Sequence, residues 1–335
     1  EMERIEPHVT VTTGRSTGFQ VSRIANETVL HNLYITGDKN MKIRVLSLFD
    51  GISVGMLALK RAGFDVEKYY ASEIKTKAMK CSFNNWGDAI EQIGDVRKAD
   101  GKKYDVDIII GGSPCQNFSR ARTSHCNVID GLAGEQSSLF FEYLRILKEN
   151  NPKYFFLENV WMPIDDQKII NRLLGVEPIR ANSSLVSYQQ RDRLYWTNIP
   201  GIELPKDRHI NFQDYKDTDE EYCDKFLVNR TPSRERMWGD GNGECPNVTN
   251  REKINCITLK QDRWKNSGLI AYKDFCRYLT TRELEIGQTL PVGYTKGLSK
   301  NEAEDVIGDA WTADMIAHFF GYLKRDMEKK QEEMK

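Results

Sequence analysis

The stretch IRVLSLFDGISVGMLALKRAG, residues 43–63, decides the fold class. Its first seven residues are mostly apolar, which predicts a buried strand. A turn containing Gly51 follows, and residues 55–63 carry apolar side chains at helical spacing up to Gly63, a typical helix stop. A strand that turns through glycine into a helix is the first half of a βαβ unit.

The same order recurs along the chain. Further strands are expected at 66–73, 106–112 and 153–160, and helices between about Glu73 and Trp86, at 137–150 and at 311–325. Strands separated by helices of this length predict an α/β fold with a doubly wound, mostly parallel sheet.

The composition of the sequence changes after Pro200. Residues 205–270 are polar, with short strand-like pieces such as NCITL at 255–259, and they predict a small separate lobe. We therefore expect an N-terminal extension at 1–40, a main domain at 41–204, the lobe at 205–270, a return to the main domain at 271–325 and a tail at 326–335.

Composition excludes several classes of protein. The 335 residues are 39% hydrophobic and 29% charged, which is enough for a packed core. No apolar run approaches 18 residues and no cleavable signal is evident, so neither a membrane span nor secretion is indicated. The seven cysteines form no CxxC pair, which favours reduced thiols inside a cell over disulfides or a zinc site. No metal is expected.

Charge is balanced overall but not locally. The formal net charge is −1, whereas residues 225–265 contain nine Lys and Arg against five Asp and Glu. This window is a candidate phosphate-facing surface, although a solvated face gives the same count.

Three successive strand ends carry residues suited to an adenosyl cofactor. Gly51 permits close backbone approach, Glu73 can accept from two ribose hydroxyls, and Asp95 can accept from an adenine amino group. No Gly-Lys-Ser/Thr follows the glycine, which disfavours a phosphate-binding P-loop.

A fourth strand end carries a thiol. In DIIIGGSPCQNFSRAR, residues 107–122, a buried strand is followed by two glycines, Pro114 and Cys115. A thiol at the carboxyl end of such a strand lies where open α/β sheets bind ligands.

Together these stretches resemble the DNA (cytosine-5) methyltransferases over about residues 43–325. FDGISVG (49–55), Glu73 and GDVR (94–97) are similar to that family's S-adenosylmethionine motifs, and GGSPCQNFS (111–119) to its nucleophile motif. ENV (158–160), QQRDR (189–193), RYLTTRELE (277–285) and GDAW (308–311) match further motifs in the family's order. The catalytic domain of the animal de novo enzymes is most similar, although Ser53 and Val54 replace glycines found in many members.

The resemblance implies a mechanism. Cys115 would attack carbon 6 of cytosine, Glu158 would be held protonated by partial burial and donate to N3, and Arg193 would contact O2. Arg191 would steady the nucleophile loop or a phosphate. The cytosine would have to be flipped out of double-stranded DNA, and residues 205–270 would be the target-recognition lobe.

The resemblance also implies two sets of binding residues. Those expected at S-adenosylmethionine are Phe49, Asp50, Gly51, Ile52, Ser53, Glu73, Asp95, Val96, Pro114, Asp309, Ala310 and Trp311. Those expected at DNA are Gln116, Ser119, Arg120, Arg122, Arg230, Arg234, Arg236, Arg251, Lys253, Arg263 and Lys265. A restriction-modification or viral DNA-protection enzyme in the cytoplasm of a bacterium, or of a virus-infected bacterial host, is the simplest expectation.

Two other readings stay open. One is a tRNA cytosine-5 methyltransferase, whose branch of the family carries a Cys-Phe-Thr signature that CIT (256–258) does not match. The other is a catalytically silent DNA-binding relative, against which the intact Cys115, Glu158 and Arg193 argue.

Overall fold

The strands of the computed structural model form two sheets. The structure describes residues 41–113, 137–238, 246–263 and 265–334, all within one compact unit, Asn40–Lys335. Within these residues the strands are β1 Met41–Leu48, β2 Phe64–Ser72, β3 Glu91–Gln92, β4 Ile108–Gly112, β5 Tyr154–Val160, β6 Ile179–Asn182, β7 Asp192–Thr197, β8 Leu269–Tyr272 and β9 Phe275–Tyr278.

Nine α-helices are described in the same residues. They are α2 Val54–Arg61, α3 Thr76–Trp86, α6 Ser137–Asn150, α7 Ile164–Leu174, α8 Glu220–Asp224, α9 Pro232–Trp238, α10 Thr281–Gly287, α11 Lys300–Asp309 and α12 Ala313–Glu333.

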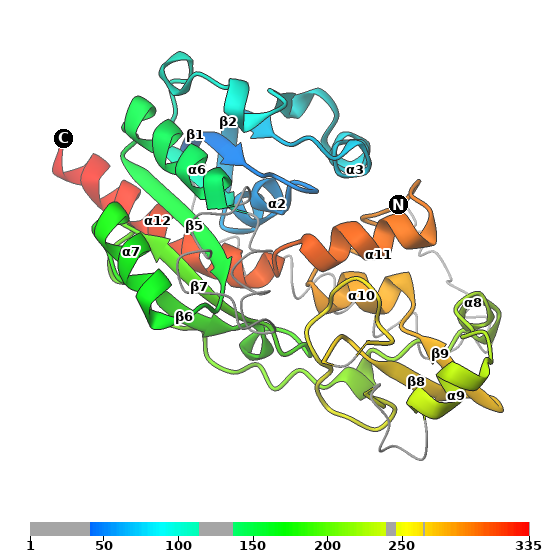
Figure 1. The fold of residues 1–335 in the computed structure, drawn as a ribbon. Helices are drawn as coiled ribbons and strands as arrows, with labels where there is room; N and C mark the ends of the chain where they lie inside the picture. Colours follow the sequence, from blue (N-terminus) through cyan, green and yellow to red (C-terminus); the bar gives the residue numbers. More distant parts are fainter. Residues whose placement is uncertain (1–40, 114–136, 239–245, 264, 335) are drawn as a thin grey trace, which may run out of the picture. The chain divides into compact units, whose positions relative to one another are not determined.

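The large sheet has the order β3-β2-β1-β4-β5-β7-β6 (Figure 1). The first five strands pair in parallel, and β7 runs antiparallel to both β5 and β6. The predicted α/β fold with a doubly wound, mostly parallel sheet is therefore confirmed.

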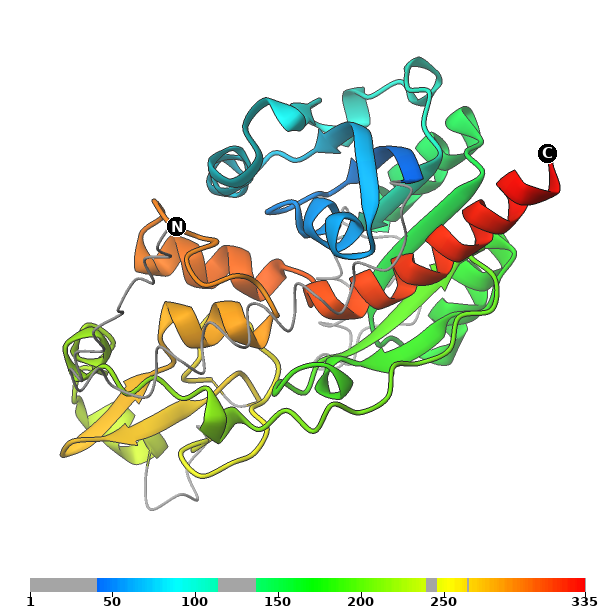
Figure 2. The same ribbon diagram turned by 180° about the vertical axis from the view of Figure 1, so that it is seen from behind.

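Helices cover both faces of this sheet. Apolar residues of α2 and α12 pack in one core cluster against β1, β4 and β5, and α12 crosses this face in Figure 2. Residues of α6 and α7 pack in a second cluster on the other face. The central strands are buried on both sides, which is why their sequences read as continuous apolar runs.

The smaller sheet is the β8–β9 hairpin. Its Ile270 shares a core cluster with residues of α10 and α11 and with Tyr188. The boundary expected at residue 270 falls inside this hairpin, so the backbone pairing of the small lobe continues to Tyr278.

One expected strand is wrong. Residues 255–259 form no strand, because their backbone bonds elsewhere: Ile254 makes an isolated bridge to Gln189, and the Ile257 N–H donates to Gln189 Oε1 at 3.2 Å. Ile257 is buried. Its apolar side chain therefore made this segment resemble a strand in the sequence, although the segment has no strand pairing. The expected tail is mostly helical, since α12 runs to Glu333 and Asp326 accepts from the Tyr154 hydroxyl at 2.6 Å.

Candidate active site at the carboxyl edge of the sheet

The loop between β1 and α2 has an unusual backbone. Phe49, Gly51 and Ser53 have φ values of 59°, 61° and 60°, so alternate residues adopt the left-handed conformation. This conformation is uncommon for residues other than glycine and occurs at sites of ligand binding. The loop is held at the edge of the sheet, because the Asp50 N–H donates to the Ser72 carbonyl at 3.0 Å.

Asp50 anchors this loop from within. Its carboxylate accepts from the Ser53 hydroxyl and from the Tyr69 hydroxyl, the latter at 2.7 Å, and both donors are buried. Burial raises the pKa of Asp50 from 3.8 to about 6, although the hydroxyl donors oppose the shift. Its side chain therefore serves the loop's structure rather than standing free for a ligand.

The contribution of Asp50 to the stability of the protein is expected to fall as pH rises from about 4 to about 6. In this window folded Asp50 keeps a proton that the unfolded chain has lost, so ionisation opposes folding. The contribution is at most about 3 kcal/mol. In urea unfolding, the free energy of unfolding of the wild type relative to Asp50→Asn should therefore decrease as pH rises through this window. A difference in unfolding free energy that does not vary with pH would contradict this. So would an equal change for the control Asp88→Asn, whose side chain is exposed.

Glu73 lies at the end of β2 against the same loop. One carboxylate oxygen accepts from Gly51 N–H at 2.8 Å, and the other accepts from the N–H groups of Ile74 and Lys75, both at 2.8 Å. Carboxylate oxygens have further lone pairs, so Glu73 can still accept from hydroxyls. Ile74 is 63% exposed beside it and offers an apolar surface.

The third strand end is close to the second, because the Ser72 hydroxyl donates to the Gly94 carbonyl at 2.7 Å. Asp95 accepts from the Arg97 N–H and pairs with its guanidinium at 2.8 Å, and Arg97 lowers the pKa of Asp95. The Val96 side chain is buried in the core. Asp309, from the end of α11, pairs with Lys75 at 2.5 Å.

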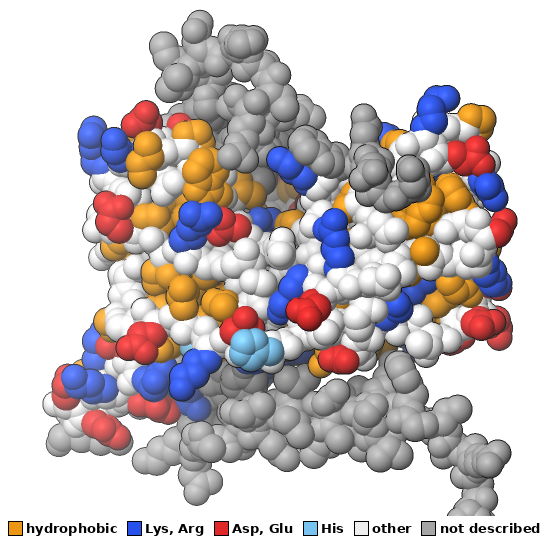
Figure 3. Space-filling model, turned by 90° about the horizontal axis from the view of Figure 1, so that it is seen from below, with side chains coloured by type: hydrophobic (Ala, Val, Ile, Leu, Met, Phe, Trp, Pro, Cys, Tyr) orange, Lys and Arg blue, Asp and Glu red, His pale blue; other side chains and the backbone are white. Residues whose placement is uncertain are grey.

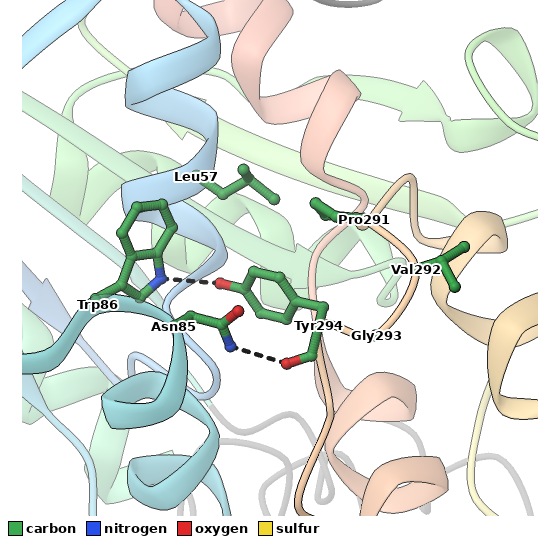
Figure 4. A pocket seen from close by; sticks show the side chains of 7 residues that line it. All are labelled: Leu57, Asn85, Trp86, Pro291, Val292, Gly293 and Tyr294. Atoms are coloured by element: carbon green, nitrogen blue, oxygen red, sulfur yellow. Dashed lines mark hydrogen bonds between the residues drawn. The ribbon is translucent and has the colours of Figure 1, made fainter. Parts of the chain in front are cut away.

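A separate pocket of about 210 Å³ opens between α2, α3 and the loop before α11 (Figure 4). Trp86 Nε1 donates to the Tyr294 hydroxyl at 3.0 Å, and Asn85 Nδ2 donates to the Tyr294 carbonyl at 2.8 Å. None of the residues predicted for catalysis, cofactor or DNA lines this pocket, whose lining is Leu57, Asn85, Trp86, Pro291, Val292, Gly293 and Tyr294.

Glu158 and Arg193 meet at the end of β5. Arg193 Nε lies 2.8 Å from Glu158 Oε1, and the two side chains are only 13% and 11% exposed. Antiparallel pairing of β5 with β7 brings them together, since Val160 is the register partner of Arg193. Trp311 Nε1 donates to the other oxygen, Oε2, at 3.1 Å.

Glu158 is thus partly buried, with Arg193 at Oε1 and the Trp311 N–H at Oε2. Its expected donation to N3 of cytosine stays a prediction.

Arg191 is buried at 4% exposure and binds backbone carbonyls. It donates to Ile257 O at 3.0 Å, Gly308 O at 3.2 Å and Ala310 O at 2.9 Å. It therefore ties β7 to the segment after Ile254 and to the link between α11 and α12. The expected role of Arg191, to steady the nucleophile loop or a phosphate, stays a prediction; in the described residues its guanidinium is enclosed by these carbonyls.

Cys256 lies beside both arginines. Arg191 Nη1 donates to its sulfur at 3.3 Å, and Arg193 Nη2 lies 3.8 Å from it. Burial alone would raise the pKa of the Cys256 thiol, but the two guanidinium groups outweigh burial and lower it.

Several predicted site residues lie outside the described part of the chain: Pro114, Cys115, Gln116, Ser119, Arg120 and Arg122. The described residues nearest to Cys115 in sequence are held in place. Asn159 Nδ2 donates to the Ser113 hydroxyl at 3.1 Å, which joins the ends of β4 and β5.

The basic residues of the lobe divide into two groups. Arg230 pairs with Glu235 at 2.6 Å, Arg234 donates to the Tyr278 hydroxyl at 3.3 Å, and Lys253 donates to two carbonyls at 2.8 and 2.9 Å. Arg234 and Lys253 are partly buried, and Lys253 joins the lobe to the main domain because its acceptors are the Ser184 and Ser187 carbonyls. The exposed members are Arg230, whose pair with Glu235 lies at the surface, and Arg236, Arg251, Arg263 and Lys265. On the face in Figure 3, basic and acidic side chains are interspersed.

Three residues that lie at the candidate site were not predicted from the sequence: Ile74, Cys256 and Gly112. Ile74 had a usable signal, because it follows Glu73 directly. A Cβ on Gly112 would come within 2.9 Å of Trp311 Nε1 and 3.1 Å of Glu158 Oε2, so glycine there admits both groups. Nothing in the local sequence indicates that contact or the neighbours of Cys256.

Residues 43–173 match the family model of the C-5 cytosine-specific DNA methylases. The orphan methyltransferase M.Rho11sI of Bacillus phage rho11s is 43% identical over 124 residues, which cover 36% of this chain and 23% of that protein. The DNA (cytosine-5)-methyltransferase DRM2 of rice, Oryza sativa subsp. japonica, is 33% identical over 144 residues, 39% of this chain and 23% of that protein. The matched part thus spans less than a third of each relative.

Solved structures share the fold over more of the chain. The Entamoeba histolytica methyltransferase EhMeth has a TM-score of 0.69 at 17% identity, covering 87% of this chain and 99% of that one. The Schizosaccharomyces pombe Dnmt2 methyltransferase has a TM-score of 0.64 at 16% identity, covering 85% and 99%. These likenesses concern the fold alone. Among the described helices, none is both long and apolar enough to cross a membrane.

Proposed function

We propose that the protein is a DNA (cytosine-5) methyltransferase that uses S-adenosylmethionine, because residues 43–173 match the family model of the C-5 cytosine-specific DNA methylases. The observation that carries the proposal is the Glu158–Arg193 pair, which presents a carboxylate and a guanidinium together at the carboxyl edge of the sheet. Ser113 follows β4 and directly precedes Pro114 and Cys115, and Asn159 holds it to the same edge.

The residues at the ends of β1 and β2 fit the cofactor. The left-handed loop at 49–53 leaves room for close backbone approach, Glu73 keeps acceptor capacity for ribose hydroxyls, and exposed Ile74 suits an adenine ring. We propose that these residues, with Asp95 and Trp311, hold S-adenosylmethionine. When bound, it supplies the methyl group that carbon 5 receives.

The chain's own groups would activate the base. The Cys115 thiolate forms a bond to carbon 6, and the displaced electron pair is shared between N3 and O2. Glu158 gives a proton to N3 and Arg193 stabilises O2. Once carbon 5 carried the methyl group, its proton would leave to a water and the carbon–sulfur bond would break. N3 would return its proton to Glu158, and the thiolate would be restored.

DNA is the proposed partner, with the target cytosine flipped out of the duplex. Arg230, Arg236, Arg251, Arg263 and Lys265 are exposed and are the lobe's candidates for phosphate contacts, whereas Arg234 and Lys253 are partly buried in contacts within the protein. Gln116, Ser119, Arg120 and Arg122 complete the proposed DNA-binding set.

Incubation with S-adenosylmethionine labelled on the methyl group tests the function. We expect label to enter duplex DNA and to be recovered as 5-methylcytosine, and sequencing of the product gives the target site. Label in tRNA but not in DNA would favour the RNA reading. No transfer to either, with DNA binding retained, would favour a silent relative.

Replacing Glu73 by Ala is expected to weaken cofactor binding about ten- to a hundred-fold, because one charged acceptor for the ribose is lost. Calorimetry with S-adenosylhomocysteine measures this directly. The matched control is Glu67→Ala, which should bind the analogue normally. Glu67 lies within β2, which Glu73 directly follows, and pairs with Lys42 at the surface. Equal affinity of Glu73→Ala and wild type would reject this placement.

A further inference from the structure

Trp311 sits on a backbone that is fixed on both sides. The Ala310 carbonyl accepts from Arg191 at 2.9 Å and from Gln288 at 3.0 Å, and the Thr312 hydroxyl donates to Gln288 at 2.9 Å. The indole can therefore change position only by rotating its own side chain.

The ring lies over the edge where the proposed cofactor residues gather. A Cβ on Gly112, at the end of β4, would come within 2.9 Å of Trp311 Nε1, and one on Gly55, in the first turn of α2, within 3.7 Å of Cζ3. Phe156 contacts the ring edge-on, with centroids 6.0 Å apart. Trp311 is partly exposed there, so part of the ring remains open to a ligand.

The same ring bonds to the catalytic carboxylate, since Nε1 donates to Glu158 Oε2. We propose, on the basis of the proposed function, that Trp311 couples cofactor binding to the position of Glu158. The bond to Glu158 holds the indole in the orientation that contacts the cofactor. By thermodynamic reciprocity, a bound cofactor strengthens that bond and holds Glu158 against Arg193, ready for the base.

A double-mutant cycle on the full chain tests the coupling without any turnover. S-adenosylhomocysteine affinity is measured by calorimetry for wild type, Glu158→Ala, Trp311→Phe and the double variant. Phenylalanine keeps an aromatic ring and removes the N–H. We expect Glu158→Ala to weaken binding about three- to ten-fold when Trp311 is present, and less than about two-fold when Phe is present.

A matched control is Trp196→Phe, which removes an indole N–H that bonds to Asn171 at 2.7 Å on another part of the sheet. In that background Glu158→Ala should weaken binding as it does in the wild type. Additive effects of the two substitutions, no effect of Glu158→Ala, or tighter binding would each overturn the coupling.

A second measurement tests the coupling if Glu158→Ala or the double variant folds poorly. The chain has six tryptophans. In a nitrogen-15 spectrum, the indole N–H signal that is missing from Trp311→Phe is the signal of Trp311. Glu158→Gln should move that signal, and S-adenosylhomocysteine should move it further. A signal that ignores Glu158→Gln would overturn the coupling, whereas a wild type that binds no S-adenosylhomocysteine would instead overturn the proposed function.

Discussion

Replacing Cys115 by Ser is expected to abolish methyl transfer, with a loss of at least about a thousand-fold, because covalent attack on carbon 6 is the step that makes carbon 5 nucleophilic. The hydroxyl is close in size to the thiol but is a much weaker nucleophile. Cofactor-analogue affinity and thermal stability should stay near the wild-type values. The measurement is transfer of labelled methyl groups to duplex DNA.

Cys256 supplies the matched control, because it is the thiol whose pKa Arg191 and Arg193 lower and it lies beside the Glu158–Arg193 pair. If Cys115 is the nucleophile, Cys256→Ser should lose no more than about ten-fold, by disturbing the arginines. DNA containing 5-fluorocytosine should trap wild type and Cys256→Ser covalently, but not Cys115→Ser. Trapping of Cys115→Ser with loss of trapping in Cys256→Ser would reverse the assignment.

The main sheet could be predicted because its signal is local. β1, β4 and β5 are buried on both faces, so each reads as a short apolar run between turn residues, and α2 and α6 show helical periodicity. The antiparallel insertion of β7 between β5 and β6 carries no such signal, since strand direction depends on the path of the chain. The small lobe was harder, because Ile257 is buried without belonging to a strand.

The candidate site was predictable where it follows from strand order. Gly51, Glu73 and Asp95 follow successive parallel strands, and such strands end at one edge of a sheet. Contacts across long sequence separations were not predictable. Trp311 lies 153 residues from Glu158, and Arg191 lies 117 residues from Gly308. Through these contacts Glu158 bonds to Trp311, and Arg191 is buried among backbone carbonyls.

Replacing Arg193 by Met is expected to lower kcat about a hundred- to a thousand-fold, because the guanidinium stabilises charge at O2 and also pairs with Glu158. Arg193→Lys should recover only part of the loss, since an ammonium lacks the planar fork. The matched control is Arg180→Met on the neighbouring strand, where an exposed arginine pairs with Asp192 at 2.5 Å and should be dispensable. Steady-state methylation and S-adenosylhomocysteine calorimetry separate the effects. A rise in KM with kcat unchanged would assign Arg193 to substrate binding alone, and an equal loss in Arg180→Met would point to a general effect of charge.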